Sequence, residues 1–276
     1  MAIKRSLKKV YLFITEYIFY NIFGAIRVLS SEKNSNYKML KDLRNRHFGE
    51  RCFIVATGPS LRIEDVEKLE NEITFSLNSI FMIFDKTKWR STYYLCMDEL
   101  HLENVLRQYG DEFDKVCKEY KFFNSNSQKT IASSKNMITK ALFLPVSRVN
   151  RLDYVPGMRR DRFYYRKDPV MGIYNSGTIT NSAIILAMYM GFKTIYLLGT
   201  DCNYKTKVRH IGKDWNDDVW TESQIDLIEL RMRNGFREIA DIAEKEGVKI
   251  YNATRGGMLE DFERVDFDTI DFGRKE

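Results

Sequence analysis

The sequence is poor in the residues that bind metals or form disulfides. Its 276 residues include four cysteines and three histidines, and the cysteines form no C-x-x-C pair. This composition argues against the usual Cys/His zinc motifs and against a disulfide framework. Cysteines in or beside apolar runs fit small buried side chains in a reducing, intracellular compartment. The P-loop motif, the full G-x-G-x-x-G fingerprint and the serine nucleophile elbow are also missing.

The sequence has neither a dense basic stripe nor a long uninterrupted apolar run. A net charge of +6 on a 30% charged background is modest, so we expect no nucleic-acid partner. The apolar stretch over residues 10–23 is interrupted by Glu16 and Asn21, whereas a membrane-spanning helix needs roughly 20 apolar residues. No small-residue cleavage site typical of a signal peptide follows it.

Four basic residues precede this aromatic-rich stretch: Lys4, Arg5, Lys8 and Lys9. A basic helix of this kind is typical of the membrane interface. We therefore expect residues 1–30 to bind the membrane surface, and the protein to be cytoplasmic and peripherally associated with the inner face of the cell membrane. The alternative is a helix that packs on the domain or on a partner chain. The oligomeric state is left open, a homo-oligomer included.

After a polar connector over residues 31–50, short apolar runs alternate with helical patterns. The runs at 53–56, 73–77, 92–97, 120–123, 194–198 and 248–251 are predicted strands, and 63–69, 179–190 and 222–246 are predicted helices. This alternation predicts an α/β Rossmann-like domain over residues 51–276, with a mainly parallel sheet and helices on both faces. Residues 145–173, which hold three prolines, interrupt the rhythm and predict a basic lid-like insertion.

Polar residues follow several predicted strands, at the edge where parallel sheets bind ligands. Thr57-Gly58-Pro59-Ser60 follows the first strand. The glycine would let a phosphate approach the backbone, and the next helix would attract the anion; a plain turn is the alternative. Asn78, Asp98 and Asn124 end three other strands. Each alone fits an Asx turn or a cap, but together they suit hydrogen bonding to a nucleobase, a ribose or a sugar.

Two further segments carry candidate residues of the same site. Ser176-Gly177-Thr178 precedes the helix at 179–190 and fits either a cap or a phosphate-binding turn. Thr200 and Asp201 end the strand at 194–198, and Tyr204 and His210 follow in a polar loop. A histidine suits general-base chemistry near neutral pH, and we take His210 as the best candidate base, with Asp201 next.

The acidic residues near the C-terminus have the spacing of a divalent-metal motif. Asp266 and Asp268 flank Phe267. Because they alternate with apolar residues, we interpret them as the polar face of an edge strand. No metal site is therefore predicted.

Taken in order, these motifs resemble the superfamily that joins family-42 bacterial sialyltransferases with MptE-like, 6-hydroxymethylpterin diphosphokinase-like domain proteins. The matching elements run from about residue 52 to 258: the strand into Gly58-Pro59-Ser60-Leu61, Leu77-Asn78, Ser176-Gly177, Ala187 to Gly191, Ile195 to Asp201, Tyr251-Asn252-Ala253-Thr254 and Gly256-Gly257.

In the sialyltransferase branch, the resemblance implies a Rossmann-like fold, a CMP-activated nonulosonic acid as donor and a metal-independent reaction. Thr57, Gly58 and Asn78 would contact the nucleotide, and Ser176 and Gly177 its phosphate. Tyr204 would be a phosphate-facing tyrosine, and His210 the base on the acceptor hydroxyl.

The sequence also departs from that branch. Thr57 stands where the sialyltransferases commonly have asparagine, and Asp98 stands where they often have an amide. The Asn252-Ala253-Thr254 segment with its Gly-Gly ending is closer to the MptE-like branch.

The expected function is thus an inverting glycosyltransferase of cell-surface glycan synthesis. Its partners would be a nucleotide-sugar donor and a glycan or lipid-linked acceptor, and it would require no cofactor. One alternative is ATP-dependent pyrophosphoryl transfer to a pterin, in which Mg²⁺ would use Asp98 and Asp201. Another is a non-catalytic, membrane-tethered assembly subunit.

Overall fold

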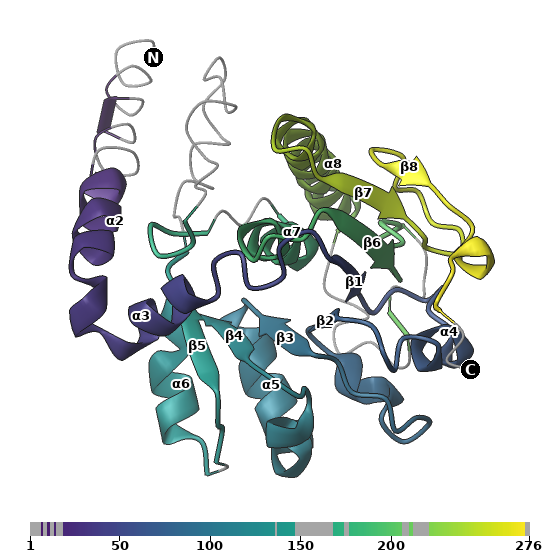
Figure 1. The fold of residues 1–276 in the computed structure, drawn as a ribbon, viewed down its shortest axis with the longest axis horizontal. Helices are drawn as coiled ribbons and strands as arrows, with labels where there is room; N and C mark the ends of the chain where they lie inside the picture. The colour runs from purple at the N-terminus through teal and green to yellow at the C-terminus, as the bar shows by residue number, and fades with distance from the viewer. Residues whose placement is uncertain are drawn as a thin grey trace.

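A computed structural model describes residues 7, 10, 11, 14, 19–135, 137–146, 168–173, 177–205, 210–211 and 221–273. Within these residues, eight strands form one parallel sheet in the order β5-β4-β3-β2-β1-β6-β7-β8 (Figure 1). The strands are β1 (Arg51–Val55), β2 (Thr74–Leu77), β3 (Tyr93–Cys96), β4 (Lys121–Asn124), β5 (Ala141–Leu144), β6 (Thr194–Leu198), β7 (Lys249–Asn252) and β8 (Glu263–Arg264). The predicted Rossmann-like α/β fold is confirmed.

The central strands are buried on both faces, which explains their nearly continuous apolar runs. In β1, Cys52 and Ile54 belong to the core on one face and Phe53 and Val55 to the core on the other. The first core is covered by α3 (Ser35–Asp42), α7 (Ile179–Tyr189) and α8 (Glu222–Lys245), and the second by α4 (Ile63–Glu67) and α5 (Glu99–Tyr109) (Figure 1). The short helix α6 (Gln128–Ser133) lies beside α5.

Six strands and three helices lie within a few residues of their predicted ranges. Two strands and three helices were not predicted: β5, β8, α3, α5 and α6. Helix α3 buries only Leu40, and α6 buries none of its residues. The apolar run of β5 is only four residues long and ends at Pro145, α5 buries little more than Leu102 and Val105, and both residues of β8 are exposed. Weak or short hydrophobic patterns therefore account for these omissions.

Residues 31–50 belong to the domain rather than forming a separate connector. Leu40 and Leu43 are buried in the core, and the backbone of residues 45–49 donates hydrogen bonds to the carbonyls at the end of α7. Asn36 covers the edge strand β5, because its side chain accepts from Phe143 N at 2.7 Å and donates to Phe143 O at 2.9 Å. Such cover protects an exposed sheet edge.

The acidic pair near the C-terminus does not lie in a strand. Phe267–Thr269 forms a 3-10 helix, and the side chain of Asp266 accepts from the amide of Asp268 at its start. Arg255 and Lys68 contact the Asp268 carboxylate at 2.7 and 2.9 Å and lower its pKa. The edge-strand interpretation was wrong. In the described part of the chain, no group of three or more His, Cys, Asp or Glu side chains could hold a metal ion.

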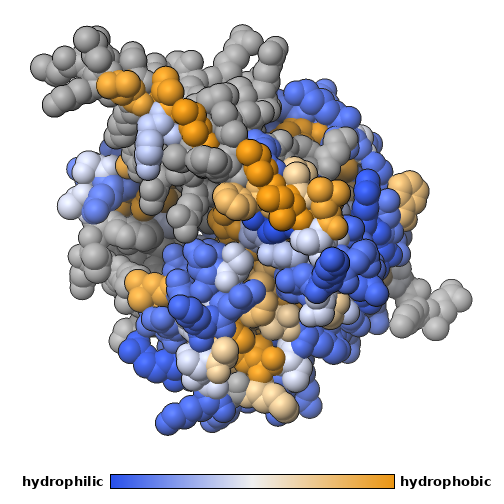
Figure 2. Space-filling model, turned by 90° about the vertical axis from the view of Figure 1, so that its left-hand side faces the viewer, coloured by the Kyte–Doolittle hydropathy of each residue, from blue (hydrophilic) through white to orange (hydrophobic). Residues whose placement is uncertain are grey.

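The N-terminal segment includes the helix α2 (Phe19–Leu29), which stands at the edge of the molecule and exposes apolar side chains (Figures 1 and 2). Among the described residues, no helix is both long and apolar enough to cross a bilayer. Most of the predicted lid-like insertion, residues 147–167, lies outside the described residues. At its ends, Val146 and Ile173 form a single parallel β-bridge.

Candidate functional site

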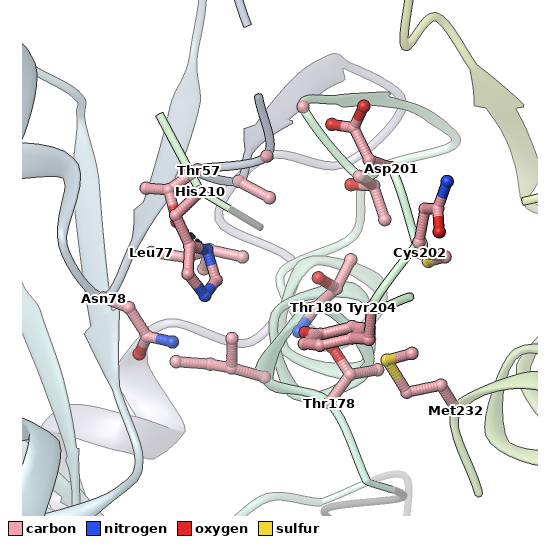
Figure 3. Close-up of a pocket in the computed structure, with 16 residues that line it drawn as sticks. Thr57, Leu77, Asn78, Thr178, Thr180, Asp201, Cys202, Tyr204, His210 and Met232 are labelled. Atoms are coloured by element: carbon pink, nitrogen blue, oxygen red, sulfur yellow. Dashed lines mark hydrogen bonds between the residues drawn. The ribbon is translucent and has the colours of Figure 1, made fainter. Parts of the chain in front are cut away.

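The strand order reverses between β1 and β6, which are hydrogen-bonded neighbours at the middle of the sheet. Parallel sheets form a ligand-binding crevice outside the carboxyl ends of such strands. A pocket lies at this point (Figure 3), lined by Ala56, Thr57, Gly58, Leu77, Asn78, Thr178, Ile179, Thr180, Gly199, Thr200, Asp201, Cys202, Asn203, Tyr204, His210 and Met232. The two polar strand ends that the sequence singled out therefore meet in one crevice.

The loop after β1 is in close contact with the loop after β6. The amide of Gly58 donates to the carbonyl of Gly199 at 2.8 Å, and a Cβ on Gly58 would overlap that carbonyl and the carboxylate of Asp201. The sequence predicted that Gly58 lets a phosphate approach the backbone. In the structure, the absence of a side chain at Gly58 lets the loop after β6 approach instead. The Gly58 amide already donates to Gly199 and is not available to a phosphate.

The Asp201 carboxylate occupies the position that a bound anion would take in a phosphate loop. Its Oδ2 accepts from Ser60 Oγ at 2.8 Å and from Ser60 N at 3.4 Å. Burial raises the pKa of Asp201, against the opposing effect of the Ser60 hydrogen bonds. Ser60 and Pro59 do not line the pocket, so this turn holds Asp201 in place.

The N-terminus of α7 forms the opposite wall of the pocket. Thr178 caps this helix by accepting a hydrogen bond from Thr180 N at 3.3 Å, and residues 178–180 line the pocket. A helix N-terminus presents free amides and a positive dipole end to an anion. Gly177, at φ +85°, packs against Arg231 of α8. Ser176, the other predicted phosphate-side residue, lies outside the described residues.

Two buried oxygen atoms of pocket residues have no hydrogen-bond partner among the described residues: Thr200 Oγ1 and Asn78 Oδ1. A buried oxygen without a partner is costly, so both atoms favour a polar ligand or water in the pocket. Asn78 has a left-handed backbone, at φ +46°. Tyr94 supports this turn by donating to the Asn78 carbonyl at 2.8 Å.

His210 lies beside Thr57, which follows the carboxyl end of β1. Its Nδ1 is 3.3 Å from Thr57 Oγ1, and the amide of the next residue, Ile211, donates to the Thr57 carbonyl at 2.6 Å. Figure 3 shows His210 and Asn78 on one side of the pocket and Thr180 and Tyr204 on the other. The chain thus places an imidazole and a helix N-terminus around the same space.

The other two histidines differ in their distance from this site. His101 Nε2 lies 2.9 Å from Ser79 Oγ, and burial lowers the pKa of His101, with a further lowering by the nearby His210. Asp98 opposes this shift and acts to raise the pKa of His101. His101 therefore lies close to the site, although the sequence-based prediction did not include it among the site residues. His47 contacts Tyr93 and Glu50 instead, at 2.8 and 3.2 Å.

Asp98 and Asn124 were predicted site residues but, like Pro59, Ser60 and Gly177, they do not line the pocket. Asp98 caps α5 by accepting from His101 N at 2.8 Å, and Asn124 accepts from Asn126 N at 2.9 Å. Both residues thus cap the helix that follows them, which is the turn-or-cap alternative given in the sequence analysis. Sequence reasoning missed Met232, which reaches the pocket from α8; a methionine on the apolar face of a helix gives no signal that separates it from the core.

The strand order and the pocket define a Rossmann-like α/β protein with a pocket at its switch point. The chain belongs to the 6-hydroxymethylpterin diphosphokinase MptE-like family, whose model matches residues 29–207. No curated protein matches the chain in sequence.

Solved structures are similar to the chain at low sequence identity. The chain is similar to the MAf glycosyltransferase from Magnetospirillum magneticum AMB-1, with a TM-score of 0.51 and 13% identity over 83% of this chain, but it spans only 35% of that protein. The sialyltransferase CstII from Campylobacter jejuni gives TM-scores of 0.48 with CMP and 0.43 with CMP-3FNeuAc. The identities are 15% and 14%, over 79% and 78% of this chain and 85% and 86% of that one.

We predict that Gly58→Ala destabilises the fold as well as disturbing the site. The new Cβ would meet the Gly199 backbone and Asp201, and overpacking of this kind costs about 1–3 kcal/mol. Gly247→Ala is the matched control: it has open space around its Cβ but a φ of +63°, so only strain of about 1–2 kcal/mol is expected. Urea unfolding measures both. A Gly58→Ala protein as stable as the wild type would contradict the close contact.

A second prediction concerns the Ser60–Asp201 contact. Because burial raises the pKa of Asp201, the ionised carboxylate lowers stability above that pKa, and the penalty disappears as the pH falls and the group is protonated. Asp201→Asn keeps an acceptor for Ser60 and should melt at the same or a higher temperature at pH 7, with the difference shrinking toward pH 4.

Ser60→Ala removes the hydroxyl donor and should instead cost about 1–3 kcal/mol. Thermal melts of both variants across this pH range test the pair. A marked loss of stability in Asp201→Asn at pH 7 would show that the negative charge itself holds the loops together.

Proposed function

We propose that this protein is a glycosyltransferase that binds a nucleotide-sugar donor in the switch-point pocket. The observation that carries the proposal is the placement of His210 opposite the N-terminus of α7 in one pocket. A transferase of this type needs a base for the acceptor hydroxyl and a positive environment for the departing phosphate. The likeness to the MAf glycosyltransferase supports the fold only.

The donor that we propose is a CMP-activated nonulosonic acid, and this choice rests on the sequence resemblance. Thr57 and Asn78 would bind the nucleoside through their hydroxyl and amide groups. The amides at the start of α7 would bind the phosphate, together with Ser176, whose role comes from the resemblance alone. Tyr204 lines the pocket next to α7 and would face the same phosphate.

In the proposed reaction, the acceptor oxygen attacks the anomeric carbon while the bond from that carbon to the phosphate oxygen breaks. The proton of the acceptor hydroxyl passes to His210, and CMP leaves with the electron pair of the broken bond. The configuration at the anomeric carbon is inverted. The Thr57 hydroxyl, 3.3 Å from Nδ1, would orient the imidazole ring. The reaction would require no metal ion.

We further propose that the acceptor is a glycan or a lipid-linked sugar, met in the cytoplasm at the inner face of the cell membrane. The basic N-terminal segment supports this location.

The family name favours a second candidate, pyrophosphoryl transfer from ATP to 6-hydroxymethylpterin. Mg²⁺ in such sites is typically bound by one or two carboxylates together with the substrate phosphates. The two candidates, Asp98 and Asp201, are not brought together: Asp98 caps α5, and Asp201 is the one carboxylate among the described lining residues. Asp201 is also bound by Ser60. In the described part of the pocket, a single carboxylate that Ser60 already holds gives little support for an Mg²⁺ site, so we rank the pterin reaction second.

We expect His210→Ala to lower turnover by about 10²–10⁴-fold, the usual contribution of a positioned general base. Donor affinity should change little, because the base acts on the acceptor. His47→Ala is the matched control, since His47 contacts Tyr93 and Glu50; His101 lies too close to the site to serve. A His210→Ala enzyme with nearly wild-type turnover would move the base elsewhere, with Asp201 the next residue to test.

Thermal denaturation with nucleotides separates the candidates. If the proposal is correct, CMP raises the melting temperature without added metal, because binding to the folded state alone is stabilising. A shift by ATP that requires Mg²⁺ would favour the diphosphokinase. No shift with either nucleotide would favour the non-catalytic assembly subunit.

A further inference from the structure

We infer that α2 docks this protein on an anionic lipid bilayer through one defined face of the helix. We call this face the lipid-facing stripe and define it by Ile22, Ile26 and Leu29. The inference deepens the proposed function by naming what the N-terminal segment binds. Only the location of the acceptor in this inference rests on the proposed function. The lipid binding itself does not depend on a nucleotide-sugar donor.

The stripe is apolar and exposed. Ile22, Ile26 and Leu29 follow the spacing of one helix face, and their exposed fractions are 49, 51 and 85%. Phe23 beside them is 57% exposed, and Leu7 earlier in the chain is 64% exposed. Figure 2, viewed from the side where α2 lies, shows hydrophobic side chains in a band across the upper surface. Contiguous apolar surface of this kind marks an interaction site.

The other side of α2 is fixed to the domain, so the stripe points away from the body. Gly24 is buried, and a Cβ there would lie 3.0 Å from Met171 O. The Arg27 guanidinium donates to Val170 O at 2.9 Å and to Met171 O at 2.6 Å. Val170 is fully buried. These contacts join one side of the helix to Val170 and Met171 and define which face is left for a partner.

The charge of the segment decides between a bilayer and a second copy of the chain. Residues 1–30 carry five basic side chains and one acidic side chain. A second copy would bring a segment of the same positive sign against the stripe, which is unfavourable. Anionic headgroups complement it, and each basic residue near such a surface adds to the attraction. Because polar residues interrupt its apolar run, the segment cannot span the bilayer. It would lie in the membrane interface with the stripe toward the acyl chains.

The test is flotation of the full-length protein with phosphatidylcholine vesicles and with mixed phosphatidylcholine–phosphatidylglycerol vesicles. The wild type should bind the mixed vesicles more strongly, and added salt should weaken this binding by screening. The triple variant Ile22→Ser/Ile26→Ser/Leu29→Ser should lower the partition coefficient by roughly tenfold or more, because it removes the three apolar side chains of the stripe from the lipid contact. These side chains are exposed, so the fold should be retained.

The matched control is Leu227→Ser/Leu230→Ser on α8, where exposed leucines (40 and 56%) lie outside the stripe. The control should bind vesicles like the wild type. Equal binding by the triple variant, or no preference of the wild type for the anionic vesicles, would overturn the inference. A wild-type dimer that the triple variant loses, without vesicle binding, would assign the stripe to a second copy. A CMP-induced thermal shift retained in the triple variant separates a failure of docking from a failure of the proposed chemistry.

Discussion

The close contact between the loops after β1 and β6 is the constraint on which the site depends. Three glycines make it possible. A Cβ on Gly199 would lie 2.6 Å from Ala56 O, a Cβ on Gly257 would lie 2.7 Å from the Asp201 backbone, and a Cβ on Gly58 would overlap Asp201. Since side chains at these positions would push the segments apart, the glycines fix the ends of β1 and β6 against the segment after β7. The pocket is built around this junction.

The junction extends into a buried polar network behind the pocket. Thr200 N donates to Thr254 Oγ1 at 3.1 Å, and Thr254 N donates to Asn252 Oδ1 at 3.1 Å. The Asn252 amide in turn donates to Leu259 O at 2.7 Å. Satisfied buried networks favour a single geometry. This network connects the Asn-Ala-Thr segment after β7 and its glycines to the site, although no described residue of that segment lines the pocket.

Most of the sheet could be predicted, because strands buried on both faces leave apolar runs that end at polar residues. The site could be predicted only in part, because a sequence does not show which distant segment a residue will contact. Gly58 was predicted to let a phosphate approach the backbone, whereas the group that approaches it in the structure is the loop at Gly199. Asp98 and Asn124 accept local backbone hydrogen bonds, and the Asn124 amide also donates to Met97 O at 3.3 Å. Their position at strand ends was therefore a poor guide to the lining of the pocket. Met232 enters the pocket through the packing of α8, which no local pattern encodes.

The position of Asp201 also limits how an anionic donor can lie in the pocket. A phosphate next to this buried carboxylate would meet a like charge at reduced dielectric, where repulsion is stronger than in water. The amides of the Gly-Pro-Ser turn cannot offset the repulsion, because Gly58 N and Ser60 N already have acceptors. The N-terminus of α7 has no such conflict, and Figure 3 shows Thr178 and Thr180 well separated from Asp201. An anionic donor is therefore expected to place its phosphate at α7 and its nucleoside toward Thr57 and Asn78.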